Sequence, residues 1–247
     1  MGLKQMVNLA TTCPHLLILR RGLWAYSLCI FFSMVSVGSV QAGTLEGTVR
    51  YLGVLPSPKI LPVAKDQDHC GKEVSIQTIH LDQAHQGGLR DVVVSVKGMD
   101  EKLYLAAKER PVLNMRCAFA PRIGIARTGQ EIEVRNQDPI LHNTHIRHGK
   151  RTFLNVAQVP GGKPIVKRLK RSGLHEIRCD KHVFMDAYLH VFPHPFYALT
   201  TGTGTFRITG IPAGKYPINV WHETLGVLEQ VVTIPETGTV RADFAYP

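Results

Sequence analysis

The segment RCDKHVFM at residues 178–185 places a cysteine, a histidine and a methionine at intervals of three residues: Cys179, His182 and Met185. Alternating apolar and polar residues flank this segment on both sides, and such alternation is typical of β-strands. The segment is therefore predicted to be a loop between two strands. A single short loop would then carry all three side chains.

A second histidine, His142, lies about forty residues upstream and is followed by Asn143. Thiolate, imidazole and thioether groups are soft or borderline donors that suit copper, and two imidazoles, one thiolate and a weak axial methionine describe a type 1 (blue) copper centre. His145 and His148 are alternatives to His142 as the second imidazole. Zinc is the competing metal, although a methionine ligand argues against it.

The composition, and the glycines and prolines that interrupt short alternating segments, predict an all-β chain. Hydrophobic residues make up 44% of the 247 residues and charged residues 19%, with 22 Gly and 15 Pro. This composition is unlike that of a disordered or coiled-coil chain. Short alternating segments between glycines and prolines indicate a sandwich or barrel. Only residues 101–108 suggest one or two helical turns.

Several motifs of the central segment resemble those of the cupredoxins, especially amicyanin and plastocyanin. The resemblance covers about residues 112–192. It is carried by FAPR at 119–122, the turn at Gly129 before EIEV, NQD at 136–138, HNTH at 142–145 and the CxxHxxM spacing at 179–185. This spacing is similar to amicyanin's short ligand loop. The resemblance implies a cupredoxin Greek-key β-sandwich over residues 111–192.

The same resemblance implies one type 1 copper ion and its ligands. His142 and His182 would supply the nitrogens, Cys179 the thiolate and Met185 the axial sulfur. Asn143 would tie the two ligand loops together from outside the ligand set. The family moves single electrons, so a cytochrome or a dehydrogenase is the expected partner, and the edge of His182 within an apolar patch is the expected electron exit.

The end of the chain, residues 199–247, resembles the transthyretin-like or carboxypeptidase regulatory-like fold, a small β-sandwich. Because about 50 residues supply too few strands, residues 43–110 and 193–247 are predicted to form one smaller sandwich, with 111–192 inserted. Plain tandem order of two domains is the alternative. The combination of both parts is similar to proteins often called methylamine utilisation proteins, a family label that does not establish a role in amine oxidation.

Residues 1–42 have the composition of a signal peptide. They contain three basic residues and no acidic ones, then a long apolar run that ends in the small-residue site before Gly43. Cleavage near Ala42 and a periplasmic location are expected, with no stable membrane span remaining; an uncleaved anchor is the alternative. Arg20-Arg21 leaves Sec and twin-arginine export both open.

Cleavage changes the charge and the cysteine count. The remaining chain keeps 26 of 29 basic and all 19 acidic residues, hence a charge of +7 that favours acidic protein partners, and nucleic acid is not an expected partner of an exported chain. Three cysteines remain. If copper takes Cys179, then Cys70 and Cys117 are left to pair as a disulfide in an oxidising compartment. The alternative is two buried thiols.

An enzymatic role is not expected. Multicopper enzymes place a histidine beside the cysteine ligand, whereas Arg178 and Asp180 flank Cys179. Four protein ligands also leave no open position for a substrate. The rival hypothesis is a non-enzymatic envelope protein that binds carbohydrate, peptide or protein, with structural copper or none.

Overall fold

The computed structural model describes residues 42–85, 87–99, 112–113 and 115–247. The predicted signal peptide, apart from Ala42, and the predicted helical turns at 101–108 lie outside these residues. In the described part of the chain, helix is confined to α1 (Gln67–Cys70) and the 3-10 turn η1 (Gln83–His85). The prediction of an all-β fold is confirmed. Neither of these short helices has the length or apolar character to cross a membrane.

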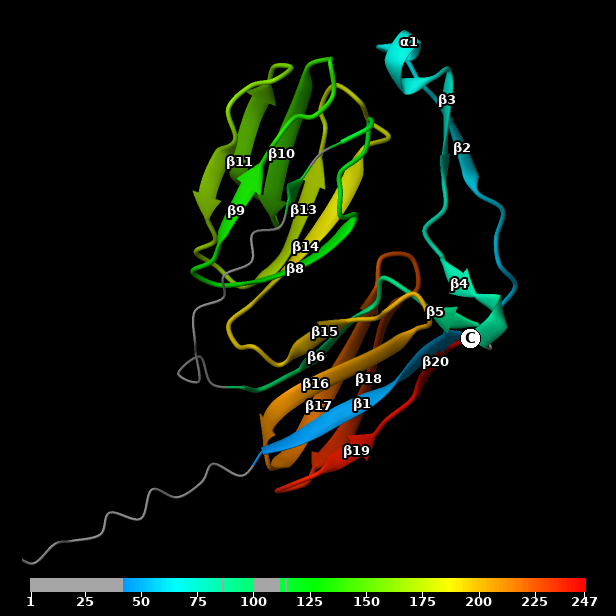
Figure 1. Ribbon diagram of the computed structural model, residues 1–247, viewed down its shortest axis with the longest axis vertical. Helices are drawn as coiled ribbons and strands as arrows, with labels where there is room; N and C mark the ends of the chain where they lie inside the picture. Colours follow the sequence, from blue (N-terminus) through cyan, green and yellow to red (C-terminus); the bar gives the residue numbers. More distant parts are fainter. Residues whose placement is uncertain (1–41, 86, 100–111, 114) are drawn as a thin grey trace, which may run out of the picture. The chain divides into compact units, whose positions relative to one another are not determined.

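Two sheets enclose the first hydrophobic core (Figure 1). One has the order β16-β1-β5-β4, with β19 and β20 also pairing with β1, and the other has the order β15-β6-β17-β18. Their bounds are β1 (Ala42–Tyr51), β4 (Leu81–Asp82), β5 (Gly88–Leu89), β6 (Val93–Val96), β15 (Tyr197–Leu199), β16 (Thr205–Pro212), β17 (Gly214–His222), β18 (Gly226–Ile234), β19 (Thr239–Arg241) and β20 (Phe244–Tyr246).

The central segment forms the second core. Its five-stranded sheet has the order β11-β10-β13-β14-β8, and a three-stranded sheet has the order β12-β9-β7. The bounds are β7 (Val112–Leu113), β8 (Ile123–Arg127), β9 (Glu131–Val134), β10 (His142–His148), β11 (Arg151–Gln158), β12 (Ile165–Arg168), β13 (Gly173–Arg178) and β14 (Asp186–Phe192). Alternation along β10 and β13 turns Thr144, Ile146 and Ile177 to the buried face.

The first core is built from both ends of the described chain. β1 pairs with β16, and β6 lies between β15 and β17, so strands that precede the central segment share sheets with strands that follow it. The central segment thus leaves and rejoins the smaller sandwich. The core of the smaller sandwich includes residues such as Leu45, Val94 and Ile218, none of them more than 1% exposed.

One early segment departs from this arrangement. We call residues 59–76 the hairpin arm: β2 (Lys59–Pro62), α1 and β3 (Glu73–Ile76), with β2 and β3 paired antiparallel. Val63 is 1% exposed within the second core, and Leu61 and Val74 pack against that core. The predicted boundary put this segment in the smaller sandwich. Val63 is instead buried, and Leu61 and Val74 partly buried, against a core whose other residues come from the central segment.

Strand β1 needs a residue without a side chain at Gly47. A Cβ atom there would overlap the carbonyl oxygen of Ala242, because β1 runs between β16 and the parallel strands β19 and β20. This explains why the opening strand carries glycine inside an otherwise alternating pattern.

We expect Gly47→Ala to lower the free energy of unfolding by an amount at the upper end of the about 1–3 kcal/mol that overpacking costs. Urea denaturation followed by circular dichroism measures the change. Gly202→Ala is the matched control, because a Cβ atom at Gly202 would meet no atom within 4 Å. Equal stabilities of the two variants would contradict the steric account.

Candidate metal centre

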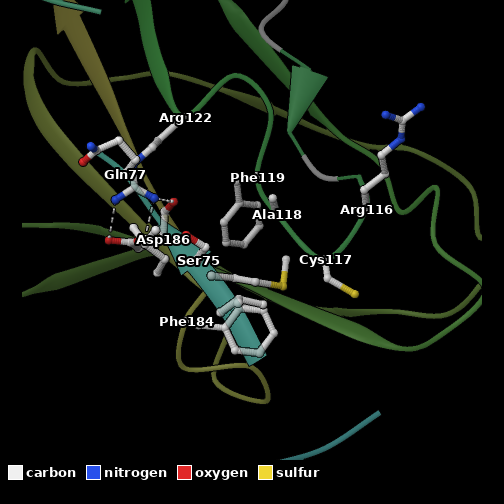
Figure 2. Close-up of a pocket in the computed structure, with 12 residues that line it drawn as sticks. Ser75, Gln77, Arg116, Cys117, Ala118, Phe119, Arg122, Phe184 and Asp186 are labelled. Atoms are coloured by element: carbon white, nitrogen blue, oxygen red, sulfur yellow. Dashed lines mark hydrogen bonds and ion pairs between the residues drawn. The ribbon is translucent and has the colours of Figure 1, made fainter. Parts of the chain in front are cut away.

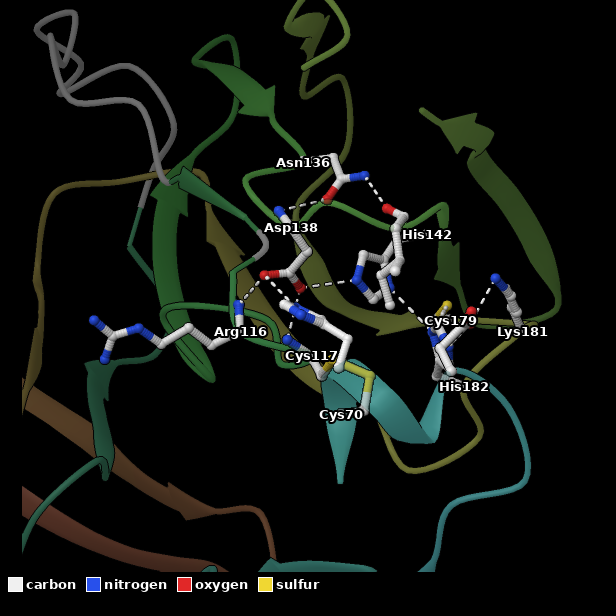
Figure 3. The surroundings of a disulfide bond; sticks show 12 residues. Cys70, Arg116, Cys117, Asn136, Asp138, His142, Cys179, Lys181 and His182 are labelled. Atoms are coloured by element: carbon white, nitrogen blue, oxygen red, sulfur yellow. Dashed lines mark hydrogen bonds and ion pairs between the residues drawn. A yellow bond between two sulfur atoms is a disulfide. The ribbon is translucent and has the colours of Figure 1, made fainter. Parts of the chain in front are cut away.

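The predicted ligands come together at one end of two neighbouring strands. His142 is the first residue of β10, and Cys179 directly follows the last residue of β13. These strands are antiparallel, with His145 opposite Arg178, so the start of one lies beside the end of the other. His182 belongs to the short loop that leads from β13 into β14. Figure 3 shows these three side chains facing one another.

The donor atoms have a spacing that fits a metal ion. The Nδ1 atoms of His142 and His182 are 3.1 Å apart, and Cys179 Sγ is 3.7 Å from His182 Nδ1. All three residues are at most 2% exposed. Metal bonds of about 2.0 Å to nitrogen and about 2.3 Å to sulfur would separate donors by about 3–4 Å. One ion can therefore be held by all three atoms without a rearrangement of the strands.

Met185 is folded back against the same loop. Its backbone N–H donates to the carbonyl of His182 over 2.9 Å, and its carbonyl accepts from the N–H of Cys179 over 3.2 Å. The side chain is 2% exposed. These bonds close residues 179–185 into a compact turn. The role of Met185 as axial ligand remains a prediction.

Asn143 connects the two ligand segments. Its backbone N–H donates to Cys179 Sγ over 3.4 Å, and its side-chain oxygen accepts from the N–H of Asp180 over 3.1 Å. Its amide group also donates to Asn155 Oδ1 on β11 over 2.7 Å. A hydrogen bond to sulfur favours the thiolate, which is the metal-binding form of cysteine. Cys179 itself is a buried free cysteine.

The alternative histidines point away from this cluster. The ring of His145 lies 3.2 Å from Asp180 Oδ1 and 3.0 Å from Thr152 Oγ1. His148 stacks on His175 with ring centroids 4.7 Å apart, at the opposite end of β10. Alternation along β10 places His145 on the other face from His142, and His148 lies six residues farther along the strand, so of the three only His142 lies beside Cys179.

Asp138 supports His142 from outside the donor cluster. One carboxylate oxygen lies 2.8 Å from His142 Nε2, and the carboxylate also accepts from the N–H groups of Arg116 and Cys117, each over 2.6 Å. Burial alone would raise the pKa of Asp138, but these hydrogen bonds outweigh it and hold the pKa below its usual value. With Nε2 engaged, Nδ1 of His142 is left to face a metal.

Asp66 supports His182 in the same way, from the hairpin arm. Its Oδ2 lies 2.7 Å from His182 Nε2 and 2.6 Å from Lys181 Nζ. Hydrogen bonds from Lys181 first, and then from His182, lower the pKa of Asp66. The His182 side chain is only 1% exposed, and Phe184 is 7% exposed. The outer edge of His182, expected to lie in an exposed apolar patch, is covered by the arm.

A disulfide anchors the hairpin arm beside the site. Cys70, the last residue of α1, is bonded to Cys117, whose N–H holds Asp138 (Figure 3). His69 also approaches Asp138, with Nε2 3.6 Å from Oδ1. His69, Cys117 and Asp138 form a second group with metal-like spacing. Because the sulfur of Cys117 is bonded to Cys70, it supplies no thiolate for a metal there.

A cavity of about 360 Å³ lies beside part of β3, next to Met185 (Figure 2). Ser75 of the arm and the following residue Gln77 border one part of it, and Phe184 borders another. Arg122 spans its rim and pairs with Asp186, with 2.8 Å between Nη1 and Oδ1. The arm is thus firmly attached near α1 and less tightly packed along β3.

Solved structures with a similar arrangement were found, whereas no protein-family model matches the chain and no curated protein is similar in sequence. A reduced amicyanin mutant is 13% identical, with a TM-score of 0.31, over 40% of this chain and 97% of that chain. A purple cupredoxin from Nitrosopumilus maritimus is 16% identical, with a TM-score of 0.27, over 30% and 80%. A copper-containing nitrite reductase from Thermus scotoductus is 16% identical, with a TM-score of 0.30, over 35% and 24%.

We expect Asp138→Asn to destabilise the metal-free protein by about 1.5–3 kcal/mol at neutral pH, because charged hydrogen bonds are lost. The folded pKa of Asp138 is lowered, so its contribution is present above the unfolded pKa of about 3.9 and is lost as the pH falls through the folded value. Urea unfolding between about pH 7 and pH 3 should therefore show a smaller acid-induced loss in the variant.

Asp180→Asn serves as the control for this prediction, since the Asp180 side chain is 54% exposed. A parallel pH dependence of wild type and Asp138→Asn would show that the buried carboxylate does not contribute.

Proposed function

We propose that this chain is exported to the periplasm, binds one type 1 copper ion through His142, Cys179, His182 and Met185, and carries single electrons between redox proteins. The observation that carries the proposal is the convergence of two imidazole Nδ1 atoms and one thiol sulfur, 3.1 and 3.7 Å apart, in a buried pocket. This donor set matches blue-copper sites in ligand type and number.

The donors favour copper over zinc. Structural zinc sites use four cysteine or histidine ligands. In the described part of the chain the two other cysteines, Cys70 and Cys117, are bonded to each other, so a single thiolate is available. A thioether from Met185 as the remaining donor is typical of copper and unusual for zinc.

The chain's own residues are arranged to hold a fixed donor set. Asp138 and Asp66 keep the Nε2 atoms of His142 and His182 engaged, so that both Nδ1 atoms face inward. The N–H of Asn143 stabilises the thiolate of Cys179. When bound, copper supplies a centre that takes up and gives back one electron. Four ligands supplied by the protein, with no position left for substrate, support an electron carrier rather than an enzyme.

Location and partner complete the proposal. A leader-like segment at residues 1–42 and the disulfide Cys70–Cys117 support export, because disulfides persist in oxidising compartments. Val183 is 86% exposed beside the ligand His182 and offers a contact point for a cytochrome or a dehydrogenase. The excess of basic residues supports a partner with an acidic surface.

We expect the protein to turn intensely blue when one equivalent of Cu(II) is added, because thiolate bonding to Cu(II) produces the colour of such sites. Visible spectra of wild type, Cys179→Ala, His142→Ala and His145→Ala, recorded side by side, measure this. The first two variants should be colourless, and His145→Ala, whose ring points away from the cluster, should keep the colour. A blue Cys179→Ala protein would contradict the proposed ligand set.

We expect the bound copper to be reduced and reoxidised reversibly in a one-electron step. Spectroelectrochemical titration should give a slope of about 59 mV per tenfold change in the oxidised-to-reduced ratio. Copper that stays bound but cannot be reduced would rule out electron transfer and favour a structural ion.

A further inference from the structure

The outer face of His182 is closed by a residue far away in sequence. Asp66 lies 116 residues before His182, yet its Oδ2 is 2.7 Å from Nε2, and the His182 side chain is 1% exposed. Lys181 contacts the same carboxylate oxygen at 2.6 Å and is 26% exposed. The imidazole edge of His182 and the ammonium group of Lys181 therefore share one carboxylate oxygen, and both charged groups are partly exposed.

We propose that Asp66 is a positioning residue of the copper centre that lowers its reduction potential and shields the edge of His182 from solvent. This inference rests on the proposed copper function and specifies how the hairpin arm takes part in it. It assigns the arm to the metal site, although the arm supplies none of the metal ligands.

The contact with Asp66 fixes the position of the proton on His182. A neutral imidazole has one N–H, and a carboxylate at Nε2 accepts a hydrogen bond from it. The proton is then held at Nε2, and Nδ1 has its lone pair free. That Nδ1 atom is the one that faces His142 Nδ1 and Cys179 Sγ.

The charge of Asp66 acts on the copper potential. Cu(II) carries one more positive charge than Cu(I), so a nearby carboxylate stabilises the oxidised ion more and lowers the reduction potential. Burial of His182, whose side chain is 1% exposed, weakens the screening between Asp66, which is 24% exposed, and the site. The ammonium group of Lys181 opposes the charge of Asp66. Removal of either charge should therefore shift the potential, and the two shifts should have opposite signs.

Asp66 is held in place by its own turn and by the anchored ends of the arm. Its carbonyl accepts from the N–H groups of His69 and Cys70, over 3.0 and 2.9 Å, and its φ of 57° is a left-handed conformation that Asp tolerates better than most residues. Val63 is buried in the second core on one side of Asp66, and Cys70 is bonded to Cys117 on the other. The carboxylate is thus anchored on both sides.

The disulfide connects the supports of both histidines. One end, Cys70, belongs to the turn that places the carboxylate of Asp66 next to Nε2 of His182. The other end, Cys117, donates its N–H to Asp138, which contacts His142. Loss of the cross-link should therefore loosen Asp66 and affect the copper potential in the same direction as loss of its charge.

The test compares wild type with Asp66→Asn, Lys181→Gln and Asp68→Asn, each produced from the full chain, loaded with Cu(II) and titrated spectroelectrochemically. We expect Asp66→Asn to raise the Cu(I) to Cu(II) ratio at a fixed potential by at least about tenfold, which corresponds to about 59 mV. Lys181→Gln should lower the ratio. Asp68→Asn, an exposed neighbour on α1, should leave it unchanged.

A second measurement needs no metal. In the copper-free protein, ¹⁵N NMR of the His182 ring at one fixed pH should show the proton on Nε2, with the signal altered in Asp66→Asn and unaltered in Asp68→Asn. The Cys70→Ser/Cys117→Ser double variant, loaded with copper, should shift its potential upward as Asp66→Asn does.

The outcomes separate the two proposals. A blue Asp66→Asn protein with the wild-type potential, shifts of the same sign in Asp66→Asn and Lys181→Gln, or a His182 proton on Nδ1 in wild type would each overturn the role of Asp66 alone. A wild-type protein that stays colourless with Cu(II) would overturn the copper function, and the potential-setting role would fall with it.

Discussion

The structure around the site depends on one constraint: two imidazoles and a thiol meet at buried positions, and every polar atom that does not face the centre of the cluster needs another partner. Burial of an unpaired polar group costs free energy, so the two outer imidazole nitrogens require acceptors. Asp138 and Asp66 supply them. These carboxylates in turn are held by the backbone N–H groups of residues 116 and 117 and by the turn at α1. The arm, the disulfide and the backbone at residues 116–117 are thus connected parts of one support for the two histidines.

Much of the fold could be predicted from local patterns. Alternation on both sides of residues 178–185 predicted strands where β13 and β14 lie, and short alternating segments between glycines and prolines predicted an all-β chain. Such alternation is visible because these strands have one buried and one more exposed side. The hairpin arm gave no such signal. Its prolines and polar residues look like a loop. Val63 is buried, and Val74 partly buried, only because a core formed by later parts of the chain lies against them. When residues far away in the sequence bury a side chain, the local alternation of apolar and polar residues does not indicate that burial.

In the candidate site, too, the residues that are close in sequence were predictable and the contacts from distant segments were not. Cys179, His182 and Met185 share one loop, and His142 with Asn143 opens a neighbouring strand, so short spacings and strand order were enough to bring them together. Asp138 had a weak signal, an acidic residue four positions before His142 in a turn. Asp66 had none, since a contact across 116 residues depends on the path of the arm. The expected open edge of His182 differs from the structure for the same reason: its cover comes from a segment that the sequence assigned elsewhere.

The pairing of Cys70 with Cys117 also divides the three cysteines of the described residues by their chemistry. The cross-link takes two sulfurs out of thiol chemistry and leaves Cys179 as the one free thiol among these residues. A chain in which Cys179 paired with either of the other two would lose that thiol and the Cys70–Cys117 cross-link in a single error. The correct pairing therefore preserves two features of the site at once.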